Sequence, residues 1–376
     1  MGTSPLAVPD RKHTHPPTPS GWIQRFTRSV NRQPDLRAGR GSNAARLLTG
    51  ALRDPENFHT DDWTGLIAAA RAEQLIGSLA FRLEGQAMPA KVEAIFEAIR
   101  QEARQVRTQA LWEAEMCRRA TAPLGVPVIL LKGTAFYAAG LDAAEGRSVG
   151  DLDILVPHER IEEVEQVLLA AGWERVKDSE GYDDLYYRRW MHELPPLVHR
   201  TRDRMIDVHH TILPPTARPT PDAAALIADS MELESGLRIL SPADIIVHAA
   251  AHLLADGDMA GGLRNLWDID RLIRQFAAAD PDFWPTLAER ARLHQLARPV
   301  ALALRLSARL YGTPVDRTVA GRWHLRDRLF QARLLARNGW GQETRKALRF
   351  AVYVRSHWLR MPPLMLARHL WVKARR

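Results

Sequence analysis

The spacing of apolar residues changes twice along the chain and predicts helical regions on both sides of a unit that contains strands. From residue 43 to about 121, apolar residues recur every three to four positions, most clearly over 91–119, as on one face of an amphipathic helix. Residues 126–131 (Val-Pro-Val-Ile-Leu-Leu) then form a short continuous apolar run, which is typical of a buried strand. Further strands are predicted at 151–156, 185–188, 196–200 and 204–210, and helices between them at 134–140 and 159–171.

Helical spacing returns after residue 240. Ser241 and Pro242 are suited to the N-cap and first turn of a helix. Helices are predicted at 243–255, 262–278, 283–293 and about 295–311. The predicted organisation is a mostly disordered basic arm (1–42), an N-terminal helical region (43–121), an α/β unit (122–240), a helical domain (241–312) and a basic Arg- and Trp-rich helical segment (313–376).

Charge is distributed unevenly over the 376 residues, whose formal net charge is +8. Residues 1–46 hold eight Lys or Arg and two acids, and residues 317–376 hold fifteen and two, which leaves −11 between them. Basic ends therefore flank an acidic body. The single cysteine, Cys117, excludes an intramolecular disulfide and a thiolate-rich metal cluster.

Apolar runs are short everywhere in the chain. None approaches the ~18 residues of a membrane span, and the N-terminus is polar and proline-rich without an apolar signal region. We therefore expect a soluble, cytoplasmic protein.

Two aspartates begin the predicted strand 151–156. Alternate side chains of a strand share a face, so Asp151 and Asp153 point the same way while the apolar residues between them face the core. Paired carboxylates on a rigid support suit Mg²⁺, which prefers oxygen ligands. Spacing alone is weak evidence, because Asp-x-Asp also occurs at 256–258, 268–270 and 280–282, outside any predicted strand.

A third aspartate lies on the predicted strand 204–210. Ile206 and Val208 would face the core, and Asp207 and His209 would face away from it. If this strand neighbours 151–156, three carboxylates converge, as in sites that hold two metals for phosphoryl or nucleotidyl transfer. The alternative is an exposed aspartate on a half-buried strand.

Lys132, Gly133 and Thr134 follow the apolar run, where a strand gives way to a helix. Free amides and the helix dipole make such a junction an anion site, and Lys132 adds a positive charge. Arg147 could likewise hold phosphate. The alternatives are an ordinary exit turn and a solvated arginine.

Three segments together resemble a known family: 130–133 (Leu-Leu-Lys-Gly), 147–156 (Arg-Ser-Val-Gly-Asp-Leu-Asp-Ile-Leu-Val) and 206–209 (Ile-Asp-Val-His). They are similar to the poorly characterised bacterial nucleotidyltransferase family of the polymerase-beta-like superfamily. The resemblance implies an α+β fold with a small mixed sheet as the nucleotidyltransferase core, flanked by N- and C-terminal helical regions.

The resemblance also implies a site. Asp151 and Asp153 would be ligands shared by two Mg²⁺ ions, and Asp207 would bind the ion that activates the acceptor hydroxyl. The nucleotide would contact four residues, namely Lys132, Gly133, Thr134 and Arg147. The wider superfamily has Gly-Ser and a shorter gap here, whereas Gly133 is followed by Thr134 and lies eighteen residues before Asp151, so the phosphate contacts match less closely than the metal ligands.

The sequence therefore predicts an enzyme that uses Mg²⁺ or Mn²⁺ to move a nucleoside monophosphate from an NTP to a hydroxyl acceptor and releases pyrophosphate. The acceptor, which could be a small molecule, a protein or a nucleic acid, is not identified, and neither is the nucleotide. The alternative is a catalytically inactive relative that binds nucleic acid or an anionic membrane through its basic ends.

Other features allow more than one interpretation. Trp323, Trp340, Trp358 and Trp371 alternate with arginines that could cover the acidic body, bind nucleic-acid phosphates or lie on a membrane surface. Two further pairs lie at helical spacing. His248 and His252 are interpreted as packed or hydrogen-bonded histidines rather than zinc ligands, and Arg264 with Asp268 as an intrahelical ion pair, while His192 and Glu193 receive no role.

Overall fold

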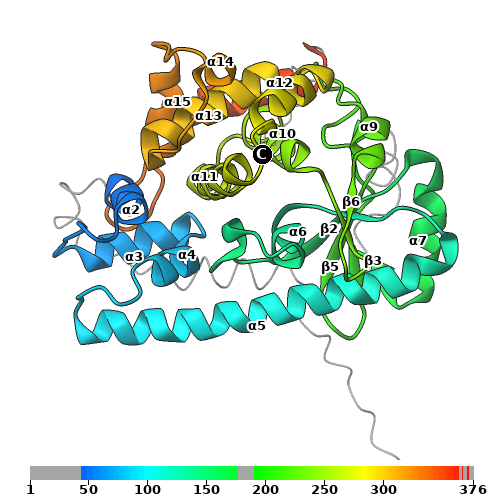
Figure 1. Cartoon of the computed structure of the whole chain (residues 1–376), viewed down its shortest axis with the longest axis horizontal. Coiled ribbons are helices and arrows are strands. Elements are labelled where there is room, and N and C mark those ends of the chain that lie inside the picture. Colours follow the sequence, from blue (N-terminus) through cyan, green and yellow to red (C-terminus); the bar gives the residue numbers. More distant parts are fainter. Residues whose placement is uncertain (1–43, 177–189, 364–365, 367–370, 372–376) are drawn as a thin grey trace, which may run out of the picture. The chain divides into compact units, whose positions relative to one another are not determined.

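The computed structural model describes residues 44–176, 190–363, 366 and 371, all within one compact unit that spans residues 42–376. The predicted disordered arm (1–42) and the predicted strand 185–188 lie outside the described residues. Within the described part, helices surround a mixed sheet (Figure 1), which confirms the predicted α+β class.

The sheet has seven strands in the order β3-β4-β5-β2-β1-β7-β6. The pairs β2/β5 and β1/β7 are parallel, and the other neighbours are antiparallel. The strands are β1 (Ile129–Leu130), β2 (Asp151–Leu155), β3 (Trp173–Arg175), β4 (Leu197–His199), β5 (Met205–His209), β6 (Met231–Glu232) and β7 (Arg238–Ile239).

The strands that carry the predicted site are where the sequence places them. β2, β4 and β5 match the predictions to within one residue at each end. The predicted strand 126–131 shortens to β1, because Pro127 has no amide hydrogen for a ladder and Leu131 already caps the next helix. β3, β6 and β7 were not predicted, since strands of two or three residues with charged side chains leave no apolar run.

In the described part of the chain, four helices precede the sheet, and the longest of them reaches along it. α5, with 32 residues, contacts α4, α6, α7 and β2 (Figure 1). The helices before the sheet are α2 (Ala44–Arg53), α3 (Trp63–Ala72), α4 (Ile76–Arg82) and α5 (Ala90–Thr121). Those between its strands are α6 (Lys132–Ala138), α7 (Ile161–Ala170) and α9 (Ala223–Ala228), with short 3-10 turns η1 (Ala122–Leu124), η2 (Asp142–Ala144) and η3 (His158–Arg160).

The helices after the sheet confirm the return of helical spacing, with one difference. The predicted helix 243–255 divides into α10 (Pro242–Ala251) and a π-helical turn, η5 (His252–Asp256), which apolar spacing alone does not distinguish from α-helix. The remaining helices are α11 (Gly262–Ala279), α12 (Phe283–Leu293), α13 (Ala297–Tyr311), α14 (Arg317–Ala320), α15 (Asp327–Leu334) and α16 (Lys346–Arg360). No described helix is both long and apolar enough to span a membrane.

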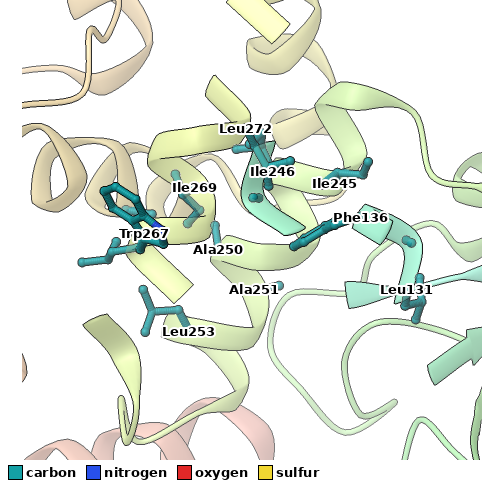
Figure 2. Close-up of a cluster of buried hydrophobic side chains, with 14 of the residues drawn as sticks. Leu131, Phe136, Ile245, Ile246, Ala250, Ala251, Leu253, Trp267, Ile269 and Leu272 are labelled. Carbon is teal, nitrogen blue, oxygen red and sulfur yellow. The ribbon is translucent and has the colours of Figure 1, made fainter. Parts of the chain in front are cut away.

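A cluster of buried apolar side chains packs α6 against the helices that follow the sheet (Figure 2). Leu131 and Phe136 come from the start and middle of the α6 segment, Ile245 and Ile246 from α10, and Trp267 from α11. All five side chains are buried. Because β1 leads directly into α6, this core fixes the position of α10 and α11 relative to the strands.

Candidate active site

Three carboxylates meet on β2 and β5, as the sequence predicts. The parallel register places Asp153 opposite Asp207, and Asp151 lies two residues earlier on the same face of β2. The potential ligand atoms of the three side chains all lie within 4.8 Å of one another. Ile154 and Val208, on the opposite face, are buried and hold the two strands in the core.

Asp153 is the buried member of the cluster and has two partners. Its Oδ1 accepts a hydrogen bond from Lys132 Nζ at 2.6 Å and lies 3.1 Å from His209 Nε2. Burial alone would raise the pKa of Asp153, but the Lys132 charge and the His209 hydrogen bond outweigh it and hold that pKa well below its usual range. Asp153 is therefore ionised at neutral pH. His209 lies on the same face of β5 as Asp207, as predicted, and is buried in this polar network.

The surroundings of Asp207 have the opposite effect on its pKa from those of Asp153. Its Oδ1 is buried and has no hydrogen-bond partner within the described residues. Burial and the negative charges of Asp153 and Glu193 raise the pKa of Asp207 to about 7. A divalent cation would supply the missing positive charge, and its preferred ligands are carboxylate oxygens, so the three side chains fit a Mg²⁺ or Mn²⁺ centre.

Lys132 begins α6 in an unusual backbone conformation. Its φ is 49°, in the left-handed region that costs a non-glycine residue about 1 kcal/mol or more. Its ammonium group forms an ion pair with Asp153. Burial would lower the pKa of Lys132, but the charge of Asp153 outweighs burial and raises it. The strand-to-helix junction is thus tied directly to the acidic cluster.

Gly133 and Arg147 are fitted to each other. A Cβ at position 133 would lie 1.7 Å from Arg147 Nη1, so only glycine leaves room for the guanidinium group. Arg147 is buried, stacks over the Phe136 ring at 5.2 Å and donates from Nε to Asp268 Oδ2 at 3.0 Å. The predicted intrahelical pair of Arg264 with Asp268 was therefore wrong, because a residue distant in sequence is the partner of Asp268.

A small cavity lies beside this junction, between α6, α10 and α11. Lys132, Arg147, His248 and Arg264 are among its lining residues. His248 is buried, and burial together with the Lys132 charge lowers its pKa, which agrees with the prediction of a packed histidine. The cavity brings three cationic side chains to the edge of the acidic cluster.

Arg264 also lines this cavity, although its spacing in the sequence predicted only a pair with Asp268. Its guanidinium makes one long hydrogen bond, from Nη1 to Ser148 O at 3.5 Å, and no ion pair with any described residue. Burial and the charge of Arg147 lower the pKa of Arg264 to about 10, against the favourable charges of Asp268, Asp151 and Asp153. No local pattern distinguishes this arginine, because its surroundings depend on how α11 packs on the sheet.

A family model described as an uncharacterised nucleotidyltransferase matches residues 59–312, which is more than half of the chain. The chain belongs to this nucleotidyltransferase family. No match was found among curated proteins. The matched range includes the sheet, the three aspartates and the helices α10 to α13.

A second group of polar residues adjoins the carboxylates of this nucleotidyltransferase. Glu193 forms a β-bridge with His209, and its Oε2 lies 3.4 Å from His209 Nδ1. Potential ligand atoms of His192, Glu193 and His209 lie within 4.8 Å of one another. The network thus runs from Lys132 through Asp153 and His209 to Glu193. Sequence reasoning missed it because residues 192 and 193 precede a predicted strand and show no motif.

Proposed function

We propose that the protein transfers a nucleoside monophosphate from an NTP to a hydroxyl acceptor with the aid of divalent cations, releasing pyrophosphate. The observation that carries this proposal is the meeting of Asp151, Asp153 and Asp207, in which Asp207 has a buried oxygen without a hydrogen-bond partner among the described residues. A cluster of like charges is unfavourable without a compensating cation. Membership of a nucleotidyltransferase family supports the reaction class.

The three carboxylates have distinct proposed roles. Asp151 and Asp153 would bind both cations, with Asp153 oriented by Lys132 and His209 through its Oδ1. Asp207 would complete the site nearest the acceptor hydroxyl. When bound, Mg²⁺ or Mn²⁺ would neutralise phosphate charge and lower the pKa of the attacking hydroxyl.

The proposed contacts to the triphosphate depend on which of the basic side chains already have a carboxylate partner. Lys132 is bound to Asp153 and Arg147 to Asp268, so both hold the site in place as well as contributing positive charge. Gly133 and Thr134 begin α6 beside them. Arg264, which has no carboxylate partner within the described residues, is the guanidinium best suited to bind a phosphate group directly.

The alternative is a catalytically inactive protein that binds nucleic acid or a membrane through its basic ends. Part of the basic C-terminal region is engaged internally, since Arg337 Nε lies 2.7 Å from Glu73 Oε1 and Arg218 stacks on Trp358 at 4.2 Å. The four tryptophans of this region, Trp323, Trp340, Trp358 and Trp371, are all exposed. Steeply salt-dependent binding of nucleic acid without Mg²⁺-dependent nucleotide binding would favour this alternative.

The test is a labelling experiment with purified full-length protein. The protein is incubated with each α-labelled NTP, Mg²⁺ or Mn²⁺ and a cell extract, and the labelled product is isolated. Asp151 is exposed and has no hydrogen bond to a described residue, so Asp151→Asn should preserve the fold and abolish labelling. Asp203→Asn is the matched control, because it makes the same change in the exposed turn before β5. Equal labelling by the wild type and Asp151→Asn would exclude the proposed mechanism.

A further inference from the structure

A second, much larger cavity lies away from the carboxylates, where the N-terminal helices meet α6, η2 and α11. Its volume is about 690 Å³, within the range of roughly 300–1,000 Å³ that is usual for small-molecule sites. Its walls come from α4, α5, the segment 137–146 and α11. None of its lining residues belongs to the nucleotide site or the carboxylate cluster proposed above.

The wall at residues 144–146 is held tightly against α4. Gly146 has φ 67°, and a Cβ there would lie 2.2 Å from the carbonyl carbon of Gly77, so two glycine backbones meet directly. Ser78 Oγ donates to Glu145 O at 3.0 Å beside this contact. The cavity therefore has a fixed wall rather than a loose loop.

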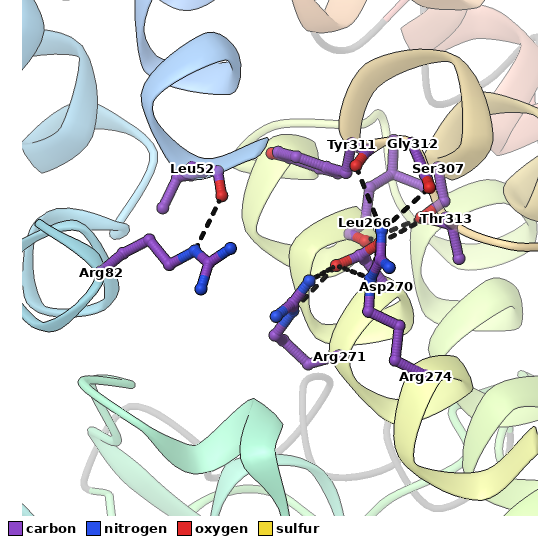
Figure 3. Close-up of polar contacts among 10 residues, drawn as sticks. All are labelled: Leu52, Arg82, Leu266, Asp270, Arg271, Arg274, Ser307, Tyr311, Gly312 and Thr313. Atoms are coloured by element: carbon purple, nitrogen blue, oxygen red, sulfur yellow. Dashed lines mark hydrogen bonds and ion pairs between the residues drawn. The ribbon is translucent and has the colours of Figure 1, made fainter. Parts of the chain in front are cut away.

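Four arginines line the cavity: Arg82, Arg104, Arg107 and Arg271. Arg104 and Arg107 lie one turn apart on α5, and both are exposed. Figure 3 shows the guanidinium of Arg82, at the end of α4, extending toward Arg271 on α11. Cationic groups from three helices thus converge on one space.

Most of this positive charge has no carboxylate partner. Within the described residues, Arg82 donates to Leu52 O at 3.1 Å, Arg104 stacks on Phe81 at 5.9 Å, and neither they nor Arg107 form an ion pair. Only Arg271 is neutralised, by Asp270. Burial and the charges of Arg271 and Arg274 lower the pKa of Arg82, against the opposing charges of Asp270 and Glu145.

The acidic residues of the cavity do not balance the arginines. Asp142 and Glu145 are its two acidic lining residues, and they leave a net positive charge. Burial and the charges of Asp142 and Glu84 raise the pKa of Glu145, against the charges of Arg82 and Arg271, and Glu145 forms no ion pair with a described residue. Guanidinium groups are suited to bidentate contacts with phosphate or carboxylate oxygens.

A wall separates this cavity from the small one beside Lys132. Tyr137 lines the large cavity, and its hydroxyl donates to Arg147 O at 2.5 Å, while the Arg147 side chain lines the small cavity. The two cavities share no lining residue among the described ones. A ligand in the large cavity would therefore occupy a site of its own.

We propose that this cavity, the arginine cavity, binds a small organic polyanion that carries phosphate or carboxylate groups. Arg104 and Arg107 bind its anionic groups from the α5 side, and Arg82 and Arg271 bind from the side of α4 and α11. The ligand reaches the cavity without displacing an internal ion pair of α5, because these two arginines of α5 have none within the described residues.

The test titrates full-length protein with inorganic triphosphate and, separately, with citrate, in a buffer containing EDTA that suppresses metal-dependent binding at the carboxylates. We expect at least one anion to bind with a Kd below about 1 mM. Binding of triphosphate alone, citrate alone or both assigns the ligand to phosphate, carboxylate or either chemistry. Calorimetry measures the affinity, and circular dichroism verifies the fold of each variant.

Matched variants locate the binding. Arg107→Gln should weaken binding about tenfold, whereas Arg119→Gln, which removes an exposed arginine of the same helix outside the cavity, should change it less than about twofold. Asp207→Asn should leave the affinity unchanged, which makes the result independent of the proposed transferase reaction. The proposal is overturned if neither anion binds, if Arg107→Gln and Arg119→Gln behave alike, if Asp207→Asn abolishes binding, or if only a single-stranded oligonucleotide binds.

Discussion

Two Asp-x-Asp sequences of this chain have the same spacing and opposite surroundings. On β2, Asp151 and Asp153 share a face of the sheet and meet Asp207. On α11, residues two apart point to different sides, so Asp268 and Asp270 have separate partners.

The partners of the α11 pair are the protein's own cations and hydroxyl groups. Asp268 accepts from Arg147, and Asp270 accepts from Arg271 Nε at 2.8 Å, Arg274 Nε at 3.0 Å and Thr313 Oγ1 at 2.7 Å (Figure 3). Each of the two aspartates thus has at least one arginine of the fold as its partner.

The strand cluster lacks this compensation. Lys132 neutralises Asp153, while Asp207 keeps a buried oxygen without a partner in the described residues. The difference shows that spacing does not identify a functional acidic pair. What distinguishes the proposed cation site is an acidic side chain that the fold positions and leaves uncompensated.

The largest expected effect is on activity. Asp207→Asn should lower nucleotide transfer by about a thousandfold, equal to about 4 kcal/mol in the activation free energy, because the cation site loses a charged ligand. The free energy of unfolding without metal should not fall, since the variant removes an unfavourable buried charge. Pyrophosphate release and urea denaturation measure the two effects. Loss of stability together with unchanged transfer would reverse the assignment of the two acidic groups.

The next effect is on stability, at the compensated pair. Asp270→Asn should lower the free energy of unfolding by about 3 kcal/mol, because it leaves Arg271 and Arg274 around a group that no longer carries their counter-charge. Asp282→Asn, in another Asp-x-Asp sequence, is the control, since that side chain is exposed. If both variants unfold at the same urea concentration, Asp270 has no structural role of this kind.

The sequence predicted the parts of this comparison that depend on local pattern. Alternation of apolar and polar residues placed β2 and β5 and the faces of Asp151, Asp153 and Asp207. Resemblance to the family supplied the expectation that these strands are neighbours, and the parallel pairing confirms it.

The parts that sequence did not predict depend on contacts between distant segments. The partner of Asp268 is Arg147, 121 residues away in the chain, so helical spacing suggested Arg264 instead. Glu193 reaches His209 through a single bridge that leaves no periodic signal. The arginine cavity is formed by four separate segments, none of which carries a motif.

The pH dependence of stability tests the raised pKa of Asp207 separately from the other carboxylates. Its pKa rises from 3.8 to about 7 on folding, so the native state retains a proton that the unfolded state loses. The wild type should therefore lose stability relative to Asp207→Asn as pH rises from about 4 to 7, by up to about 2 kcal/mol after allowance for solvent exposure, and the difference should then level off. Denaturation of both proteins at each pH, without metal, measures this difference. A constant difference would show that Asp207 is ionised throughout.

The smallest expected effect separates the two arginines of the small cavity. Arg147 has its counter-charge in Asp268, whereas Arg264 has none within the described residues, so their removal should affect different properties. Arg264→Gln should raise the KM for NTP about tenfold, equal to about 1.4 kcal/mol, with little change in stability, because its guanidinium is free to bind phosphate. Arg147→Gln should instead lower the free energy of unfolding, since it leaves Asp268 buried without its partner.

Arg292→Gln, on the exposed side of α12, controls for the loss of one positive charge. If Arg264→Gln destabilises the fold and leaves KM unchanged, Arg264 is a structural residue like Arg147, and the phosphate contact must come from the α6 junction alone.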